Sequence, residues 1–245
     1  MQTRTGQEVS ARRLIVLAVC LALGIWFWDS PVLWPLKLLV VMMHETGHAL
    51  ATLLVGGSVD RISIASDESG LCLSRVPVGA FNQIVVYSAG YLGSAIAASL
   101  LLLATLRWRL RRAVPIILAL WLLIMTVAYV RDVFTLLFCL AIAAILAAIA
   151  RWLPDDAVDG VNLFLAAFSA LYALIDLRMD LWDGAVRARS DAALLADITW
   201  VPAIVWAVVW SVIAIAIFGV TFKASLASRG KPRPEASTQP RGRMR

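Results

Sequence analysis

Long apolar stretches alternate with short polar ones along almost the whole chain. A helix needs about 20 apolar residues to cross the hydrocarbon core of a bilayer, and seven of the stretches reach or approach that length. Together they predict an all-α, polytopic membrane protein with about seven transmembrane helices. The predicted segments are Leu14–Trp28, Val32–Val55, Ile84–Leu106, Ala113–Val130, Val133–Ala150, Val161–Leu177 and Ile198–Phe222.

The composition strengthens this interpretation, because 61% of the 245 residues are hydrophobic and only 16% are charged. A soluble domain of this size could not bury so much apolar surface in one core. A disordered chain is excluded for the same reason. The three cysteines are widely spaced and indicate neither a disulfide framework nor a thiolate metal site. We therefore expect a protein whose main solvent is the lipid bilayer.

The net charge of +6 lies mostly at the chain ends and in short loops. We divide the sequence into a basic N-terminal segment (1–13), a single membrane domain (14–222) and a disordered basic C-terminal tail (223–245). Four predicted crossings separate the arginine cluster of residues 107–112 from the tail, so both are expected on the cytoplasmic side. Such a tail suits anionic lipid headgroups, and no nucleic-acid partner is expected.

One stretch departs from the helical pattern. Residues 59–64 alternate between apolar and polar side chains, and so do residues 71–75. The sequence Asp-Glu-Ser-Gly at 67–70 supplies turn residues between them. This pattern predicts a small β-hairpin directly after the second apolar segment.

The second apolar segment contains the only two histidines of the chain, in the sequence His44-Glu45-Thr46-Gly47-His48. Residues four apart lie about 40° apart around a helix, one turn above each other, so both imidazoles can bind one metal ion. Glu45 is rotated by about 100° and can act on a water beside the metal. A glutamate inside a membrane segment is costly and therefore indicates function.

A catalytic zinc ion usually has three protein ligands and a water. With no third histidine, the third ligand is expected to be a carboxylate. Asp132 and Asp191 stand at helix starts, where capping explains an aspartate. Asp176 lies near the C-terminal end of an apolar helix, where the dipole and lipid disfavour an anion, so it is the first choice. Asp180, Asp132 and Asp191 remain alternatives, as ligands or as supports of the ligands.

The third apolar segment carries small residues four apart, with Gly90 paired to Ser94 and Gly93 paired to Ala97. Such faces let membrane helices approach closely. We expect this helix to pack against the metal-binding helix, where Gly47 also leaves room.

With these residues assembled, the chain resembles the site-2 protease family of intramembrane zinc metalloproteases, especially its compact branch in bacteria and plants. The resemblance covers most of residues 39–210. It rests on Met43–Leu50, Gly56-Gly57, Ala89–Gly93, Asp176-x-x-x-Asp180-Leu181, Ser190-Asp191-Ala192 and Trp206 with Trp210.

The resemblance implies one catalytic Zn²⁺ bound by His44, His48 and an aspartate, with Glu45 as the catalytic base. It implies membrane-protein substrates that are cut within or near transmembrane segments. We expect a multi-pass protein of the bacterial inner membrane, with the C-terminus in the cytoplasm as the arginines indicate.

A substrate helix must unwind before its peptide bonds can be attacked. The hairpin can hold the unwound segment by strand addition, and we expect Ile62 and Ile64 to form this clamp. Proline at either position should then impair cleavage while zinc stays bound.

Two other functions fit part of the pattern. An ion-coupled transporter would explain buried ionisable groups, but not a glutamate between histidines at metal spacing. A non-catalytic zinc-binding scaffold would explain the histidines but has no need of Glu45.

Overall fold

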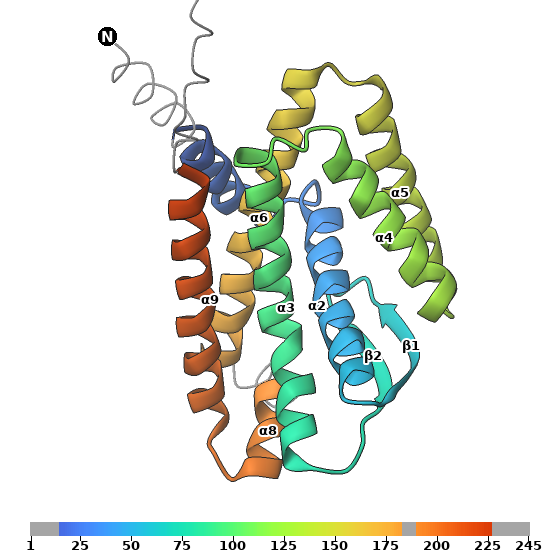
Figure 1. The fold of residues 1–245 in the computed structure, drawn as a ribbon, viewed down its shortest axis with the longest axis vertical. Coiled ribbons are helices and arrows are strands. Elements are labelled where there is room, and N and C mark those ends of the chain that lie inside the picture. Colours follow the sequence, from blue (N-terminus) through green and yellow to red (C-terminus); the bar gives the residue numbers. More distant parts are fainter. Residues whose placement is uncertain (1–14, 183–189, 227–245) are drawn as a thin grey trace, which may run out of the picture.

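In the computed structural model, residues 15–182 and 190–226 are described, with residues 179–182 and 226 described by their backbone alone. Long helices run side by side along the molecule, and a two-stranded sheet lies against one flank (Figure 1). After a short N-terminal helix, Ile15–Trp26, the elements are α2 (Trp34–Leu54), β1 (Ser58–Ile64), β2 (Gly70–Arg75), α3 (Ala80–Leu106), α4 (Ala113–Tyr129), α5 (Val133–Trp152), α6 (Asp155–Trp182), α8 (Asp191–Thr199) and α9 (Ala203–Leu226).

Each predicted apolar segment corresponds to a helix, but seven membrane crossings are not confirmed. Within the described residues, four helices are long and apolar enough to span a membrane, namely α3, α5, α6 and α9. The N-terminal helix and α4 are shorter. Helix α2 has 21 residues, yet its lysine, histidines and glutamate reduce its apolar character. The coarser prediction of a mostly helical protein with membrane-spanning helices is confirmed.

The last predicted segment crosses a break between two helices, because we expected it to begin at Ile198. The structure ends α8 at Thr199, and Trp200 has a left-handed backbone with φ of 62°. Pro202 follows, and a residue before proline is unfavourable in helix, so α9 begins only at Ala203. It continues to Leu226, into the predicted tail. The rest of the tail and residues 1–13 lie outside the described residues.

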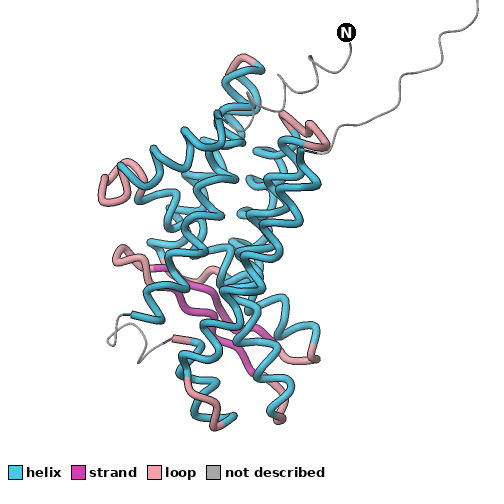
Figure 2. Tube along the Cα trace, turned by 90° about the vertical axis from the view of Figure 1, so that its left-hand side faces the viewer, coloured by secondary structure: helices cyan, strands magenta, loops and turns pink. Residues whose placement is uncertain are grey.

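The predicted hairpin is confirmed. Strands β1 and β2 pair antiparallel, with an irregularity between Val59 and Arg61, and they cross the lower half of the helices in Figure 2. The other edge of β1 is occupied, because Ile62 bridges Val130 at the end of α4. The amide of Ile64 also donates to Oγ1 of Thr135 at 3.0 Å. The hairpin is thus built into the bundle through β1.

Helices α2 and α3 touch through their backbones, as the small residues predicted. A Cβ atom added to Gly93 would lie 3.0 Å from Cα of Gly47. A Cβ atom on Gly47 would collide with the carbonyl group of Ala89. This close crossing sets the distance between the histidine-bearing helix and its neighbour.

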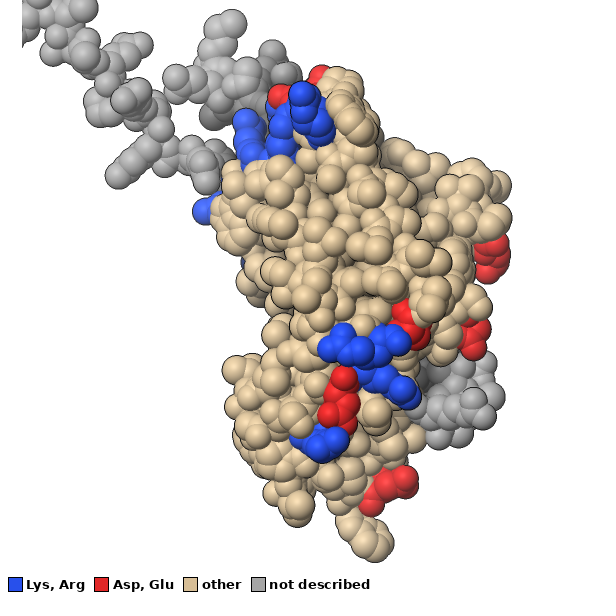
Figure 3. Space-filling view, turned by 90° about the vertical axis from the view of Figure 1, so that its right-hand side faces the viewer, with Lys and Arg blue, Asp and Glu red and all other residues tan. Residues whose placement is uncertain are grey.

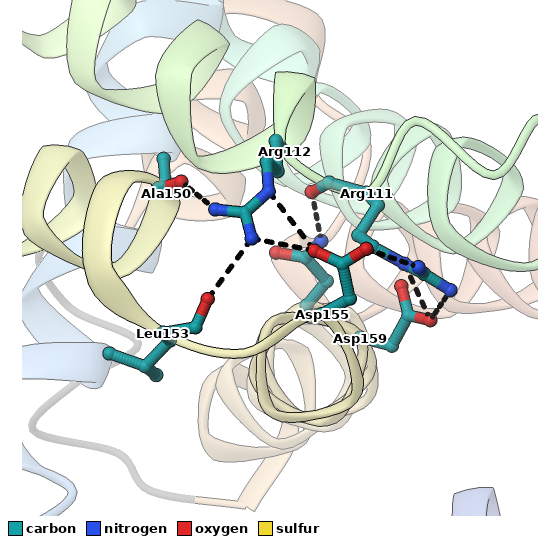
Figure 4. A network of polar contacts seen from close by, with 7 residues as sticks. Arg111, Arg112, Ala150, Leu153, Asp155 and Asp159 are labelled. Atoms are coloured by element: carbon teal, nitrogen blue, oxygen red, sulfur yellow. Dashed lines mark hydrogen bonds and ion pairs between the residues drawn. The ribbon is translucent and has the colours of Figure 1, made fainter.

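A network of ion pairs joins the start of α4 to the start of α6 (Figure 4). Arg111 donates to Asp159 and to Asp155, both at 2.9 Å. Arg112 donates to Asp155 and to the carbonyl oxygens of Ala150 and Leu153, at the end of α5. These contacts hold the connection between α3 and α4 against the connection between α5 and α6.

The end of α9 lies at the same end of the molecule, since Arg107 donates to the carbonyl oxygen of Ala224 at 3.0 Å. This agrees with the expectation that the arginine cluster and the tail share one side. On the face shown in Figure 3, charged side chains gather at this end and in a second band lower down. Between the two bands the surface is largely uncharged, as expected of a surface in contact with lipid.

Candidate metal centre

Helix α2 places the two histidines one turn apart, against α3. Their ring centroids are 4.7 Å apart, and the ring of Tyr91 packs edge-on against His44 at 4.6 Å. The Glu45 side chain between them is buried. The local pattern His-x-x-x-His therefore produces the expected convergent pair of imidazoles.

Helix α8 brings Asp191 to these imidazoles. Oδ2 of Asp191 lies 3.1 Å from Nε2 of His44 and 3.1 Å from Nε2 of His48. The helix is anchored by Ala192 and Leu195, which are buried in an apolar cluster with Tyr91 and Trp210. Burial of these residues turns the neighbouring Asp191 toward α2.

The three side chains form a donor set that fits zinc. Their ligand atoms all lie within 4.8 Å of one another. Around a tetrahedral zinc ion with bonds of about 2.0–2.1 Å, two ligand atoms are about 3.3 Å apart, close to both 3.1 Å distances. Two imidazoles and one carboxylate also form a known catalytic zinc set, which leaves the fourth position for water.

Asp176, our first choice from the sequence, does not belong to this donor set. Its Oδ2 lies 4.0 Å from Nδ1 of His44, on the side of the ring away from Asp191. The geometry therefore favours Asp191 as the third ligand. Asp132 caps α5 by accepting from the amide of Thr135 at 2.8 Å, and the side chain of Asp180 lies outside the described residues.

One signal in the sequence could have identified Asp191. Ser190 is the N-cap of α8, and its hydroxyl accepts from the amide of Ala193. A helix start with a serine cap needs no second capping side chain. The aspartate that follows it was therefore not explained by capping.

The second ring nitrogens of the two histidines differ. Nδ1 of His48 donates to the carbonyl oxygen of Val86 at 2.8 Å, which leaves Nε2 as the nitrogen with a free lone pair. Nδ1 of His44 is buried and makes no hydrogen bond to any described residue. Only one of the two imidazoles is thus oriented by a direct partner.

The metal centre opens into a cavity of about 700 Å³ between α2, α3, α8 and β2. The backbone of Cys72 in β2 hydrogen-bonds to the Glu45 carboxyl group, so the edge of β2 not paired with β1 faces the centre. Burial, followed by the negative charge of Glu45, raises the pKa of the Cys72 thiol to about 12. The cavity is lined by Val41, His44, Glu45, His48, Glu68, Ser69, Gly70, Leu71, Cys72, Leu73, Ser74, Val76, Val86, Tyr87, Tyr91, Asp176, Ser190, Asp191 and Leu194.

The turn of the hairpin is tied to the first turns of α2. Lys37 and Glu68 form an ion pair at 3.0 Å, and the Lys37 ammonium lies 4.7 Å from the ring centre of Trp28. The indole of Trp34 donates to the carbonyl oxygen of Ser66 at 2.9 Å. These contacts fix the turn of the hairpin relative to the N-terminal end of the helix that carries Glu45.

Two glycines form walls of the centre. A Cβ atom on Gly90 would collide with Nε2 of both histidines, and one on Gly70 would collide with the carboxyl group of Glu45. The small residue predicted to serve helix packing at position 90 thus also makes room at the metal-binding atoms.

Ile62 and Ile64, the expected clamp residues, point away from the cavity. Their side chains are 0% and 4% exposed and belong to the main apolar core. With its outer edge joined to Val130 and Thr135, β1 offers no free edge at these positions. The hairpin edge next to the metal centre belongs to β2.

Comparison with known proteins identifies one family. A family model described as Peptidase M50B-like matches residues 16–221, which include the three candidate ligands and Glu45. No curated protein and no solved structure gave a significant match.

Proposed function

The chain belongs to the M50B-like peptidase family, and on this premise we propose that it is a zinc metalloprotease of the membrane. We propose further that it hydrolyses peptide bonds within or near transmembrane segments of membrane-protein substrates. This membership agrees with the resemblance to site-2 proteases found in the sequence.

One observation carries the proposal. The distances from a carboxylate oxygen to two imidazole nitrogens suit three ligands of one zinc ion. The carboxyl group of Glu45 lies beside them, on the same helix as the two histidines. The residues come from α2 and α8, which are far apart in the sequence. A glutamate buried at this point has a function in a protease and none in a purely structural metal site.

In the proposed mechanism, His44, His48 and Asp191 hold the metal ion. Zinc in such a site supplies the positive charge that acidifies water and polarises a substrate carbonyl group. Glu45 accepts a proton from the attacking water and then delivers it to the leaving nitrogen. Its contact with the backbone of Cys72 keeps the carboxyl group oriented toward the cavity.

We place the substrate along β2 instead of along Ile62 and Ile64. An unwound segment needs partners for its exposed amide and carbonyl groups, and an unpaired strand edge supplies them. The edge of β2 lies against the catalytic glutamate, and the exposed side chains of Leu71 and Leu73 line the same cavity. A strand docked there would run past the metal centre.

We propose that the protein lies in the bacterial inner membrane with a cytoplasmic C-terminus, and the charge distribution supports this orientation. Arg107, Arg111 and Arg112 lie at the end of the molecule where α9 ends. Positive residues favour the cytoplasmic side of membrane proteins. The metal centre lies at the other end of α6, away from this cluster.

The test is substitution Glu45→Gln in the full chain, assayed on a reporter protein with one transmembrane segment. Cleavage should fall by about 10³-fold or more because the proton acceptor is lost. Zinc content, measured by elemental mass spectrometry, should remain at one ion per chain.

Glu68→Gln is the matched control, since it makes the same change at the other glutamate that lines the cavity. The amide can still accept a hydrogen bond from Lys37, so most activity should remain. Cleavage by Glu45→Gln at the wild-type rate would contradict the role of Glu45 as proton acceptor. Absence of cleavage by the zinc-loaded wild-type chain would favour a zinc-binding scaffold.

A further inference from the structure

We propose that Asp176 is a positioning residue for the metal centre, which orients His44 from behind through its Nδ1 atom. The inference rests on the metal site of the proposed function but not on proteolysis. It is based on a comparison of the two imidazoles. Both Nε2 atoms face Asp191, but only one of the two Nδ1 atoms has a hydrogen-bond partner.

A metal-binding imidazole normally donates its other N–H to an acceptor, which fixes the ring and makes the ligand nitrogen more basic. His48 meets this requirement through the carbonyl oxygen of Val86, at 2.8 Å. The same atom of His44 has no such partner among the described residues, although it is buried. A buried ring N–H without an acceptor is costly, so a partner is needed when the metal is bound.

The other sides of the His44 ring are already in use. Nε2 faces Asp191 at 3.1 Å, and Tyr91 packs edge-on against the ring at 4.6 Å between centroids. On the Nδ1 side, Oδ2 of Asp176 lies at 4.0 Å. This distance is too long for a direct hydrogen bond but suits a small side-chain rotation or one bridging water.

Helix α6 presents Asp176 in a manner that favours this role. Its side chain is 33% exposed and lines the cavity, so water can reach the gap between the two atoms. One turn earlier, Tyr172 is buried and anchors the helix in the main core. A carboxylate at this point completes a carboxylate–histidine–metal arrangement, while Asp191 completes the ligand set.

The experiment measures zinc affinity by competition with a chelator of known affinity, using the full chain in detergent. Asp176→Ala should still bind one zinc ion per chain, but about 10–100-fold more weakly than the wild type. Asp176→Asn should recover most of that loss, because its amide oxygen can still accept from Nδ1. Asp191→Ala should lose stoichiometric zinc altogether, since it removes a ligand.

Cobalt(II) in place of zinc gives a second reading that a general loss of structure would not reproduce. Asp176→Ala should keep the wild-type pattern of visible absorption bands, because the ligand atoms are unchanged, whereas Asp191→Ala should lose it. Asp156→Ala is the matched control, an exposed aspartate at the opposite end of the same helix, and should change neither reading.

Wild-type zinc affinity in Asp176→Ala would overturn the inference. Loss of zinc in Asp176→Ala together with its retention in Asp191→Ala would also overturn it, and would make Asp176 the ligand. A wild-type chain that binds no zinc would overturn the proposed function as well, so the two failures are distinguishable.

Discussion

Two clusters of charged side chains lie at different levels of the bundle, and they are satisfied in different ways. Where α4 and α6 begin, Arg111 and Arg112 are matched by Asp155, Asp159 and backbone carbonyl oxygens (Figure 4). Between α2 and α8, Glu45 and Asp191 line one cavity that has no lysine or arginine among its described lining residues.

The difference separates a structural network from a binding site. In the first cluster, cations and anions of the same chain neutralise each other, so nothing more is needed. In the second, the carboxyl groups lie beside two imidazoles, which carry no permanent charge, and a buried excess of negative charge is costly unless a cation joins it. Carboxyl groups gathered without a lysine or arginine beside them favour a metal ion at this cavity, whereas the ion pairs at the other cluster do not.

The most severe test of this difference is to fill the space at the metal centre without changing its charge. Gly90→Ala adds one methyl group where it would collide with Nε2 of both histidines. Zinc affinity should fall by about 100-fold or more, because the added methyl group displaces the two nitrogen atoms that bind the metal. Chelator competition measures the change.

Gly219→Ala in α9 is the control for this substitution, because nothing lies within 4 Å of an added Cβ atom there. It should leave zinc affinity unchanged. Tight zinc binding by Gly90→Ala would mean that the imidazoles bind from another direction.

The second prediction concerns which strand of the hairpin a substrate contacts, β2 at the cavity or β1, which is joined to the helices. A photo-reactive amino acid at Leu73, which is exposed in the cavity, should cross-link to a bound substrate segment. The same group at Asp60, exposed on β1 but absent from the cavity lining, should give several-fold less product. Yields are compared by immunoblot in the Glu45→Gln background, which retains substrate. Equal yields would remove the assignment to β2.

The third prediction tests the matched cluster. Arg112→Ala removes a guanidinium that bonds Asp155 and two carbonyl oxygens at the end of α5. The pair is half-exposed, so we expect the melting temperature to fall by only about 2–4 °C, with zinc content unchanged. A thermal-shift assay measures it, and high salt should reduce the difference. Loss of zinc in this variant would show that the two clusters are coupled.

The smallest effect concerns Cys72, whose thiol reports the charge of the cavity. Its pKa of about 12 lies above the ordinary value, so the reactive thiolate is scarce at neutral pH and increases about tenfold per pH unit up to that pKa. Alkylation of the metal-free protein, followed by mass spectrometry, should show this slope. Glu45→Gln removes a negative charge and should speed alkylation at pH 8. An unchanged rate would mean that burial alone controls this thiol.

The sequence predicts best what depends on residues close together in the chain. His44, Glu45 and His48 are placed by helix periodicity alone, and the hairpin follows from alternation on both sides of a turn. The contact of α2 with α3 also follows from a local pattern, because small residues such as Gly47 and Gly93 let apolar helices approach closely.

What the sequence does not predict depends on packing between distant elements. Asp191 follows His48 by 143 positions (191 − 48) in the sequence. It reaches the metal centre because α8 is buried beside Tyr91. The choice between the two edges of the hairpin depends on Val130 and Thr135, which occupy β1. The preference for Asp176 was correct about the neighbourhood and, by the geometry, not about the ligand set.

The backbone contact between Gly47 and Gly93 limits how the molecule can fluctuate. Because no side chains separate α2 from α3 there, their spacing is already at its steric minimum. Thermal motion can part these helices, but neither thermal motion nor lateral pressure from the bilayer can bring them closer. The contact therefore limits motion in one direction only. The two histidines cannot move closer to α3 when a substrate enters. Any breathing that admits a substrate has to come from elements that are packed through flexible side chains.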